Sequence, residues 1–378
     1  MAKLRITYPS LRQPGRVTFG SGSIKTLAEA DGLQDTVFFL SSSNGVRTAV
    51  DAAFQKRGLS LSELQVCAKP PGEPSLETIE FGANFLAKLA PRRIVGIGGG
   101  SVMDWCRLAW AQQQGLLSSV AGTMQVPTDD RSRPAFWLIP TTCGTGAEAA
   151  AVAVYSSGGR KVAAVSDAFV AEQVVLDGRF LDQMPDGELA DSLGDTISHA
   201  IESYSSVVPN TLAKEAAVSA LRLVLEHGSS PAGSCRNDKL MEAGYFGGVA
   251  ASNCSVGVIH AFAHTISRYG VSHGHANAIG LRAGLTVNAA APALQSLASR
   301  VGVSSPQELE QKLQPIVNRA IEGRDHRPLL ATLTDEKHRG EIVSGMRSDV
   351  CLRSNPLPLS DADLLAFIDH VVEGLSRA

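Results

Sequence analysis

Short apolar runs alternate with amphipathic stretches along the first half of the chain. Three runs rich in branched and aromatic residues lie at 36–43, 92–101 and 135–148, and each ends in small polar residues or glycines. Between the first two runs, apolar residues recur at helical intervals, at Leu76, Ile79, Ala83, Leu86 and Leu89. Strands that alternate with helices are typical of a parallel sheet covered by helices, so we predict an α/β fold for this half.

The pattern changes near Pro185, and from there the helical period continues almost to the end of the chain. Examples are the segments "AKEAAVSALRLVLEHG", which stops at a glycine, and "DADLLAFIDHVVEGLSRA". Runs typical of strands are sparse in this half. A chain of 378 residues is also too long for one small core. We therefore expect an α/β domain at 1–184 and an all-helical domain at 185–378.

Composition and charge narrow the classes of partner. Hydrophobic residues make up 44% and charged residues 19% of the chain, as in ordinary globular enzymes. The formal net charge of −3 gives no reason to expect nucleic acid or an anionic membrane as a partner. The segment "MAKLRITYPSLRQPG" has no apolar core of a signal peptide, and no run reaches the ~20 apolar residues of a membrane helix. We therefore expect a cytoplasmic protein whose six scattered cysteines are free thiols.

Two turns rich in glycine and threonine follow predicted strands. A helical pattern follows the first turn, which contains Gly98, Gly99, Gly100 and Ser101. The second, "PTTCGTGAE", offers three hydroxyls, at Thr141, Thr142 and Thr145. Each turn alone is also compatible with a tight turn that binds nothing. Together, at one end of a parallel sheet, they predict a dinucleotide site, because glycine lets the backbone approach a phosphate and the following helix points its N–H groups at it.

A third strand end carries three serines in a row, Ser41, Ser42 and Ser43. In dinucleotide-binding sheets this position often carries an acidic residue that binds the ribose 2′-hydroxyl. A small neutral residue removes the charge that would repel a 2′-phosphate. The serines therefore favour NADP(H) over NAD(H), unless they form a loop with no role in binding.

Histidines are concentrated in the segment "IHAFAHTISRYGVSHGHANAIG", which holds four of the nine in the chain. Within it, His260 and His264 are four residues apart in an apolar helical pattern, and His273 lies in "SHGHA", where Gly274 predicts a turn. Asp195 and His199 form a second pair with helical spacing, elsewhere in the helical half. Each pair alone is compatible with an ordinary hydrogen bond. One carboxylate with three imidazoles drawn from this set would form a divalent-metal shell suited to Fe or Zn.

The same segment suggests how a substrate is recognised. If "HAFAHTISR" is one helix, Arg268 extends the face of His260 and His264 by another turn, and Asn253 lies on the same side. An arginine near a metal would suit an anionic tail such as a phosphonate, phosphate or carboxylate. The alternative is a salt bridge at the surface or between the domains. His275 has three open interpretations: support of a ligand, substrate contact or a structural role.

Four blocks together resemble the iron-dependent (group III) alcohol dehydrogenase family: "GGGSVMD", "PTTCGTGAE", "DTISHAIES" and "HAFAH…HGHANA". Their order and spacing match over nearly the whole chain. The resemblance implies an N-terminal α/β dinucleotide-binding domain with a parallel sheet and an all-α C-terminal metal-binding domain, the architecture shared with dehydroquinate synthase. The active site would lie between the two. "HGHA" and "SHAIES" are also similar to the phosphonoacetaldehyde-reductase branch of the family.

The resemblance also implies residue roles. The metal ligands would be Asp195, His199, His260 and His273, whereas His264 would lie near the nicotinamide and relay a proton. The pyrophosphate would be held by Gly98, Gly99, Gly100 and Ser101. Other residues would lie at the cofactor, namely Thr141, Thr142, Thr145, Asp104 and Lys161. The chain departs from the family pattern at Arg107, where lysine is usual, at Ser272, where proline is common, and in a His260–His273 interval one residue shorter than in several relatives.

These observations predict reversible hydride transfer between NADP(H) and a small aldehyde or alcohol, with Fe(II) or Zn(II) as a Lewis acid. A homodimer is a further expectation. One alternative is a sugar-phosphate cyclase that uses NAD within a lyase cycle, although the helical half has few lysines and arginines beside the proposed ligands. Another is a relative that binds metal and nucleotide without catalysis.

Overall fold

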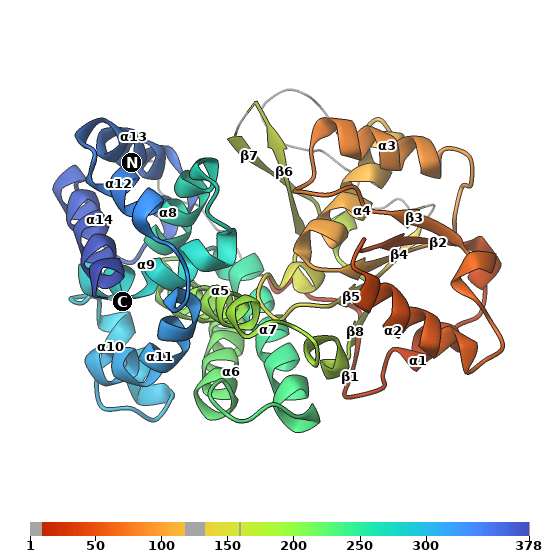
Figure 1. The fold of residues 1–378 in the computed structure, drawn as a ribbon, viewed down its shortest axis with the longest axis horizontal. Coiled ribbons are helices and arrows are strands. Elements are labelled where there is room, and N and C mark those ends of the chain that lie inside the picture. Colours follow the sequence, from red (N-terminus) through yellow and green to blue (C-terminus); the bar gives the residue numbers. More distant parts are fainter. Residues whose placement is uncertain (1–9, 118–132, 159, 378) are drawn as a thin grey trace.

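The computed structural model describes residues 10–117, 133–158 and 160–377, and it contains an α/β half and a helical half side by side (Figure 1). The predicted fold class is confirmed. The α/β half contains a sheet of six parallel strands in the order β1-β8-β5-β4-β2-β3. The strands are β1 (Arg16–Phe19), β2 (Thr36–Leu40), β3 (Gln65–Ala68), β4 (Arg93–Gly98), β5 (Ala135–Pro140) and β8 (Gln173–Leu176).

Helices cover both faces of this sheet because the strands are apolar on both sides. In β2, Phe38 and Leu40 pack with one hydrophobic cluster, whereas Val37 and Phe39 pack with another. The first cluster includes residues of α1 (Lys25–Ala28) and α2 (Asn44–Gln55), and the second includes residues of α3 (Leu76–Leu86) and α4 (Gly100–Gln113). Short 3-10 helices also occur in this half: η1 (Leu33–Asp35), η2 (Leu61–Glu63), η3 (Ala147–Ala149), η4 (Asp167–Phe169) and η5 (Gly178–Leu181).

A two-stranded antiparallel hairpin, β6 (Val152–Ser157) with β7 (Arg160–Val165), lies at the side of the α/β half that faces the helical half (Figure 1). Polar contacts attach it to α4. Asp104 Oδ2 accepts a hydrogen bond from the Val154 amide at 3.1 Å, and the fully buried Arg107 donates to the Ala150 carbonyl at 2.8 Å. Arg107 also pairs with Asp104 at 2.6 Å. The arginine that departs from the family pattern therefore anchors the hairpin.

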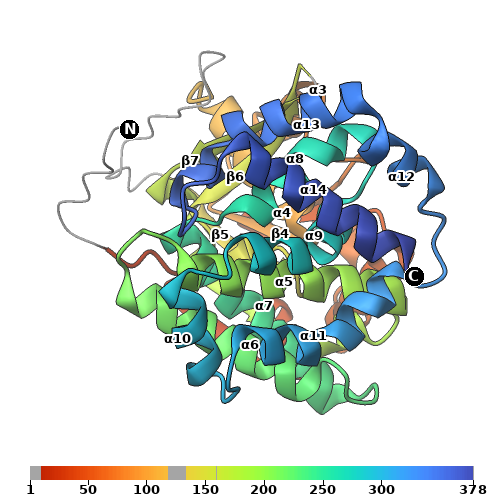
Figure 2. The same cartoon turned by 90° about the vertical axis from the view of Figure 1, so that its left-hand side faces the viewer.

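The helical half is wound around α5, which packs against α6, α7, α9 and α11 (Figure 2). All regular elements among the described residues after 185 are helical, as predicted. They are α5 (Asp186–Ser205), α6 (Thr211–His227), α7 (Ser234–Cys254), α8 (Val258–Ile266), η6 (Ser267–Tyr269), α9 (His273–Val287), α10 (Pro292–Arg300), α11 (Pro306–Ile321), α12 (Arg327–Thr334), α13 (Glu336–Ser348), η7 (Val350–Ser354) and α14 (Asp361–Ser376).

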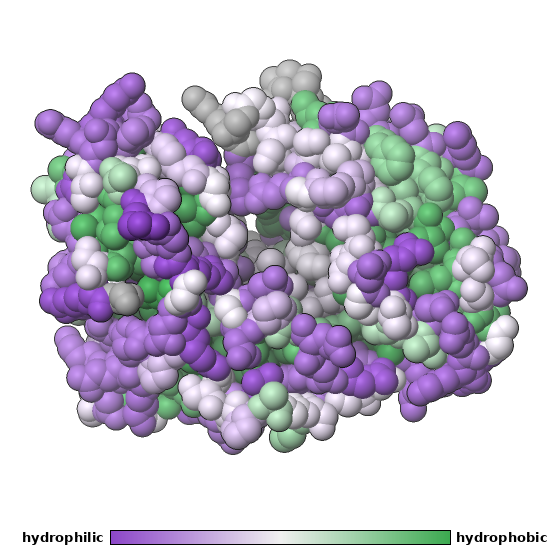
Figure 3. Space-filling view, viewed as in Figure 1, coloured by the Kyte–Doolittle hydropathy of each residue, from purple (hydrophilic) through white to green (hydrophobic). Residues whose placement is uncertain are grey.

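Glycines allow the two halves to meet at α7. A Cβ atom on Gly248 would lie 2.5 Å from Cα of Gly146, and one on Gly244 would lie 2.4 Å from the carbonyl oxygen of Cys143. Gly146 also has a φ of 58°, which side-chain-bearing residues rarely adopt. The turn after β5 is therefore pressed directly onto the backbone of α7. Away from this contact, the surface is hollowed between the two halves (Figure 3).

No single helix of the described residues is long and apolar enough to cross a membrane. The helix α7 and the segment Val258–Tyr269 reach the length and apolar composition of a membrane span only when taken together, and the two are bent by 100° relative to each other.

Glu148, at the same contact with α7, is a buried carboxyl group. It is 3% exposed, and its Oε2 atom has no hydrogen-bond partner among the described residues. Burial raises the pKa of Glu148 to about 7, and the opposing effects of its own backbone N–H and the Arg107 charge are smaller. The folded protein therefore favours the protonated form relative to the unfolded chain.

Glu148→Gln is expected to remove a pH-dependent loss of stability. Because the folded pKa lies above the unfolded value of 4.5, the contribution of the carboxyl group is present at low pH and is lost as pH rises through 7. Between pH 5 and pH 8 the free energy of unfolding of the unsubstituted protein should fall by about 2.5 kcal/mol relative to the variant, at 1.36 kcal/mol per pKa unit. Urea unfolding at both pH values measures this difference. Glu80→Gln on the exposed face of α3 is the control, and an equal difference at both pH values would contradict the assignment.

Candidate functional site

Three imidazoles surround one carboxylate oxygen in the helical half. Oδ1 of Asp195 lies 3.8 Å from His199 Nε2, 3.6 Å from His260 Nε2 and 3.6 Å from His273 Nε2. The donor atoms of Asp195, His260 and His273 all lie within 4.8 Å of one another, and His199 joins them through Asp195. These residues come from α5, α8 and α9, so the structure brings together the four that the sequence suggested as ligands.

This donor set fits a divalent metal ion. Ligand atoms about 2.1 Å from a tetrahedral ion lie roughly 3.4 Å from one another, close to the distances around Asp195. Three neutral imidazole nitrogens and one carboxylate oxygen suit Fe(II) or Zn(II). Two buried polar atoms at the cluster, His273 Nδ1 and Asn277 Oδ1, have no partner among the described residues, although buried polar atoms normally have one. We call these four residues, Asp195, His199, His260 and His273, the Asp195 cluster.

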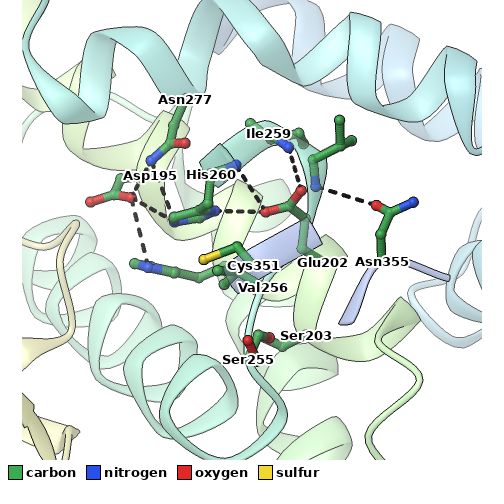
Figure 4. Close-up of polar contacts among 12 residues, drawn as sticks. Asp195, Glu202, Ser203, Ser255, Val256, Ile259, His260, Asn277, Cys351 and Asn355 are labelled. Atoms are coloured by element: carbon green, nitrogen blue, oxygen red, sulfur yellow. Dashed lines mark hydrogen bonds and ion pairs between the residues drawn. The ribbon is translucent and has the colours of Figure 1, made fainter. Parts of the chain in front are cut away.

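Hydrogen bonds behind the cluster orient its imidazoles. His260 Nδ1 donates to Glu202 Oε2 at 2.6 Å, and the other oxygen of Glu202 accepts from the Ile259 amide at 2.6 Å (Figure 4). His199 Nδ1 donates to the carbonyl oxygen of Gly144 at 3.2 Å. Because each Nδ1 atom makes these hydrogen bonds, Nε2 is the atom of both rings that faces Asp195. Such outer partners fix the tautomer and raise the basicity of metal ligands.

The charges of the cluster favour a cation. Burial alone would raise the pKa of Asp195, but its interactions with His199, His273 and His260 lower it well below its ordinary value. Burial lowers the pKa of His199 to about 4 and also lowers that of His273. Burial opposes the charged form of His260 as well, yet hydrogen bonds to Asp195 and Glu202 raise its pKa to about 9. The buried carboxylates therefore attract positive charge to the side of the cluster where His260 lies.

His264 lies beside the Asp195 cluster. Its ring stacks on that of His273, with 5.3 Å between centroids and 14° between planes. Its Nδ1 atom donates to Asp349 Oδ2 at 3.0 Å, and 27% of its side chain is exposed. A partly exposed imidazole held by a carboxylate is able to pass a proton between the cluster and solvent.

The turns predicted to bind a cofactor meet at the carboxyl ends of the neighbouring strands β5, β4 and β2. A Cβ atom on Gly100 would lie 2.7 Å from Thr145 Oγ1, and one on Gly98 would lie 2.4 Å from Val102 Cγ2 and 3.3 Å from Ser41 Cβ. The Thr141 amide donates to the Gly98 carbonyl at 3.0 Å. Because α4 begins at Gly100, its first N–H groups open at this junction, as an anion site requires. Also at the junction lie Gly99, Ser101, Thr142 and the exposed Ser42.

Two further residues expected at the cofactor have identified partners. Asp104 binds Arg107 and the backbone of β6, so it contributes to holding the hairpin. Lys161, on β7, pairs with Glu73 at 2.8 Å. Burial is the main cause of the lowered pKa of His273, and the positive charge of Lys161 contributes to it.

The expected turn at Gly274 is wrong, because the helix α9 begins at His273 and continues through Gly274. A Cβ atom on Gly274 would lie 2.8 Å from the carbonyl oxygen of Asp191, so this glycine allows α9 to approach α5. His275, two residues after His273 on α9, is buried. Its Nδ1 atom lies 3.2 Å from Asp191 Oδ1, and its ring stacks on that of His326. These contacts favour a structural role for His275.

The structure does not bring Arg268 or Asn253 to the cluster. The helix α8 ends at Ile266 and tightens into η6, which breaks the expected continuation of the histidine face. The Arg268 guanidinium donates to the carbonyl oxygens of Thr265 and Glu341 and lies over the ring of Tyr269. The side-chain amide of Asn253 binds the backbone of Arg12.

Several residues of the site were missed by the sequence interpretation: Glu202, Asn277, Asp349 and Cys351. Two of them carry a local signal. Glu202 lies seven residues after Asp195, on the same helix face, and Asn277 lies four residues after His273. Asp349 lies 85 residues from His264, so only the tertiary structure connects them.

Comparison with known proteins agrees with this geometry. Residues 14–178 match the family described as "Iron-containing alcohol dehydrogenase", and residues 189–372 match "Fe-containing alcohol dehydrogenase family, C-terminal". Aldehyde-alcohol dehydrogenase 2 of Entamoeba histolytica is 27% identical over 298 residues, which are 74% of this chain and 34% of that protein. This chain therefore spans about a third of the length of the long curated relatives that it matches.

Two relatives are similar over nearly their whole length. The NADPH-dependent butanol dehydrogenase of Clostridium saccharobutylicum is 23% identical over 379 residues, covering 96% of this chain and 97% of that protein. The structure of sulfoacetaldehyde reductase from Bifidobacterium kashiwanohense in complex with NAD+ superposes with a TM-score of 0.80, at 22% identity, covering 97% of this chain and 99% of that one. At this identity the structural likeness shows a shared fold.

Glu202→Gln is expected to weaken metal binding by about 10–100-fold, because the neutral amide no longer supports His260. Metal sites in other proteins lose affinity by this factor when a hydrogen-bond partner of a ligating histidine is removed. Metal content after dialysis against a graded series of chelator concentrations measures the change. Glu242→Gln, which removes a carboxylate paired with Lys239 on α7, is the control. Equal metal retention by both variants would show that Glu202 does not support a metal ligand.

Proposed function

The chain belongs to the iron-containing alcohol dehydrogenase family, and on that basis we propose that it is a metal-dependent aldehyde reductase that transfers hydride reversibly between NADP(H) and a small aldehyde. The observation that carries this proposal is the Asp195 cluster, formed by one carboxylate and three oriented imidazoles. The hydrogen bond from His199 to the Gly144 carbonyl of the α/β half supports a reaction centre between the halves.

The proposed ligands are Asp195, His199, His260 and His273, which would hold one divalent ion, Fe(II) or Zn(II). When bound, such an ion supplies Lewis-acid stabilisation of negative charge on the carbonyl oxygen, and the nicotinamide supplies or accepts the hydride. The contribution of the protein is preorganisation. Glu202 and the Gly144 carbonyl hold two of the imidazoles before any ligand arrives, so little reorganisation accompanies the reaction.

A proton must also reach the carbonyl oxygen during reduction, and His264 is the proposed donor. Asp349 accepts the Nδ1 proton of His264, which leaves Nε2 as the atom that gains or loses the transferred proton. Burial raises the pKa of Asp349, but the hydrogen bond from His264 outweighs this effect and lowers it below its ordinary value. Partial exposure of His264 allows Nε2 to regain its proton from water between turnovers.

The cofactor preference is proposed from the end of β2. Ser41 is half-buried against Gly98, Ser42 is exposed, and neither carries the negative charge that would repel a 2′-phosphate. This supports NADP(H) over NAD(H). Among the relatives, the clostridial enzyme is NADPH-dependent, whereas the bifidobacterial structure holds NAD+.

We propose that the substrate is a small aldehyde and that it carries an anionic tail such as a phosphonate, phosphate or carboxylate. The bifidobacterial relative is a sulfoacetaldehyde reductase, so an anionic aldehyde is compatible with this fold. In this chain Lys161 replaces Arg268 as the candidate partner of such a tail, because it lies on β7, in the hairpin that faces the helical half, whereas Arg268 is held by the carbonyl oxygens of Thr265 and Glu341.

We expect the purified protein, supplied with Fe(II) or Zn(II), to oxidise NADPH in proportion to added aldehyde, with a higher kcat/KM for NADPH than for NADH. Ser42→Asp should lower kcat/KM for NADPH about tenfold or more, because like charges a few Å apart near a protein surface repel by roughly 1–4 kcal/mol. Absorbance of the reduced nicotinamide measures both results. His260→Ala, which lacks a proposed ligand, is the inactive control. Absence of NADPH and NADH oxidation with neutral and anionic aldehydes alike would refute the proposed function.

Asp349→Asn is expected to lower kcat about 10–100-fold, because His264 loses the charge that orients it. This loss is smaller than the full contribution that general acid–base catalysis usually makes to a rate. The KM for the aldehyde and the content of iron held by the Asp195 cluster should stay unchanged, since Asp349 contacts no residue of the Asp195 cluster in the described structure. Steady-state kinetics over a pH series, with metal analysis of the same samples, separates these quantities. Asp369→Asn, a surface carboxylate paired with Arg339, is the control. If Asp349→Asn loses the iron of the Asp195 cluster and its kcat per bound iron is unchanged, the proton-transfer role is contradicted.

A further inference from the structure

A second group of potential metal ligands lies beside the first. His264, Asp349 and Cys351 come from α8, the end of α13 and η7. His264 Nδ1 lies 3.0 Å from Asp349 Oδ2 and 4.0 Å from Cys351 Sγ, and the three donor atoms all lie within 4.8 Å of one another. We propose that this group is a second cation site, specific for a thiophilic divalent ion such as Zn²⁺, at which the ion inhibits the enzyme.

The spacing of the three atoms fits a tetrahedral ion. With bonds of about 2.1 Å to nitrogen and oxygen and about 2.3 Å to sulfur, neighbouring ligand atoms lie roughly 3.4–3.6 Å apart. The observed distances of 3.0 Å and 4.0 Å lie on either side of this range, so small side-chain rotations suffice. His264 and Asp349 have side chains 27% and 15% exposed, which leaves an entry path and a fourth position for water.

The loop that carries two of the ligands is held in place without using the ligand atoms. The Cys351 amide donates to Asp349 Oδ1 at 2.8 Å, so Oδ2 remains directed at His264. The Cys351 carbonyl accepts from Ser354 Oγ at 2.9 Å. The Asp349 amide continues the hydrogen bonding of α13 to Gly345. Little conformational entropy is therefore lost when an ion binds.

The donor chemistry distinguishes this site from the Asp195 cluster. A thiolate favours zinc over magnesium, calcium or manganese, whereas the Asp195 cluster contains no sulfur. Binding would release the Cys351 thiol proton to solvent, and the thiolate and the Asp349 carboxylate would then neutralise both charges of the ion. A half-buried site without net charge avoids the cost of leaving a charge uncompensated.

An ion at this site would occupy the Nδ1 atom of His264, the proton of Nδ1 would pass through solvent to Nε2, and the hydrogen bond to Asp349 would be lost. The inhibition that follows rests on the proposed function, because it requires that His264 transfer a proton. Binding itself does not, and it is tested separately. The enzyme is then expected to lose activity in excess Zn²⁺ while it keeps the ion of the Asp195 cluster.

Cobalt(II) provides a direct probe of binding. Added to the iron-loaded protein, cobalt chloride should produce thiolate-to-cobalt charge-transfer absorption in the near ultraviolet, with about one ion bound per chain at saturation, and ZnCl2 should abolish it. Cys351→Ser should lack this absorption, whereas the control Cys235→Ser, which removes an exposed thiol at the start of α7, should retain it. Asp349→Asn should weaken cobalt binding by at least roughly 100-fold, the upper end of the loss seen when an outer partner is removed.

Inhibition is measured on the same samples with iron content determined in parallel. Zn²⁺ should inhibit the unsubstituted protein and Cys235→Ser with iron retained, and Cys351→Ser should resist it. The proposal is overturned if the absorption is absent from the folded unsubstituted protein, or if it persists in Cys351→Ser. It is also overturned if Zn²⁺ inhibits both cysteine variants equally and displaces iron. Circular dichroism checks folding, and Asp349→Asn carries the binding test if Cys351→Ser does not fold. A protein without reductase activity that still shows the Cys351-dependent absorption would refute the proposed function alone.

Discussion

The close approach of α5 and α9 is the constraint on which the candidate site depends. A Cβ atom on Gly194 would lie 2.5 Å from Cβ of Ala278, and one on Gly274 would lie 2.8 Å from the Asp191 carbonyl oxygen. Larger residues at these two glycines would separate the helices. His273 would then move with α9 away from Asp195, which lies one residue after Gly194. The ligand geometry therefore rests partly on glycines that contribute no polar side chain.

The turn after β5 connects this cluster to the α/β half. The Gly144 carbonyl in this turn accepts the Nδ1 proton of His199, and Thr145 in the same turn packs against Gly100 at the start of α4. One short segment thus positions a proposed metal ligand and lines the proposed phosphate site. Because Gly146 is pressed onto α7, the segment has little freedom to move on its own. This coupling gives a physical reason for the glycines and threonines to occur together in "PTTCGTGAE".

Two buried carboxylates at the site favour the binding of a cation. Asp195 and Glu202 are 2% and 5% exposed, and both contact His260. Two carboxylates withdrawn from water are costly unless positive charge compensates them. A proton on His260 supplies part of that charge in the absence of an ion, and a divalent cation would supply more. The outer shell that orients the ligands therefore also increases the attraction for the metal.

The sequence by itself determined the elements and the kinds of donor. Alternating and helical periods predicted the parallel α/β half and the helical half, and the spacing of four residues placed Asp195 with His199 and His260 with His264, because such periods reflect local backbone geometry. Short strands such as β1 and β8, with four residues each, were beyond this signal. Only the tertiary structure decided that Gly274 continues a helix, that Arg268 contacts Glu341, and that His264 meets Asp349 and Cys351. Those outcomes depend on packing between segments distant along the chain, which no local pattern encodes.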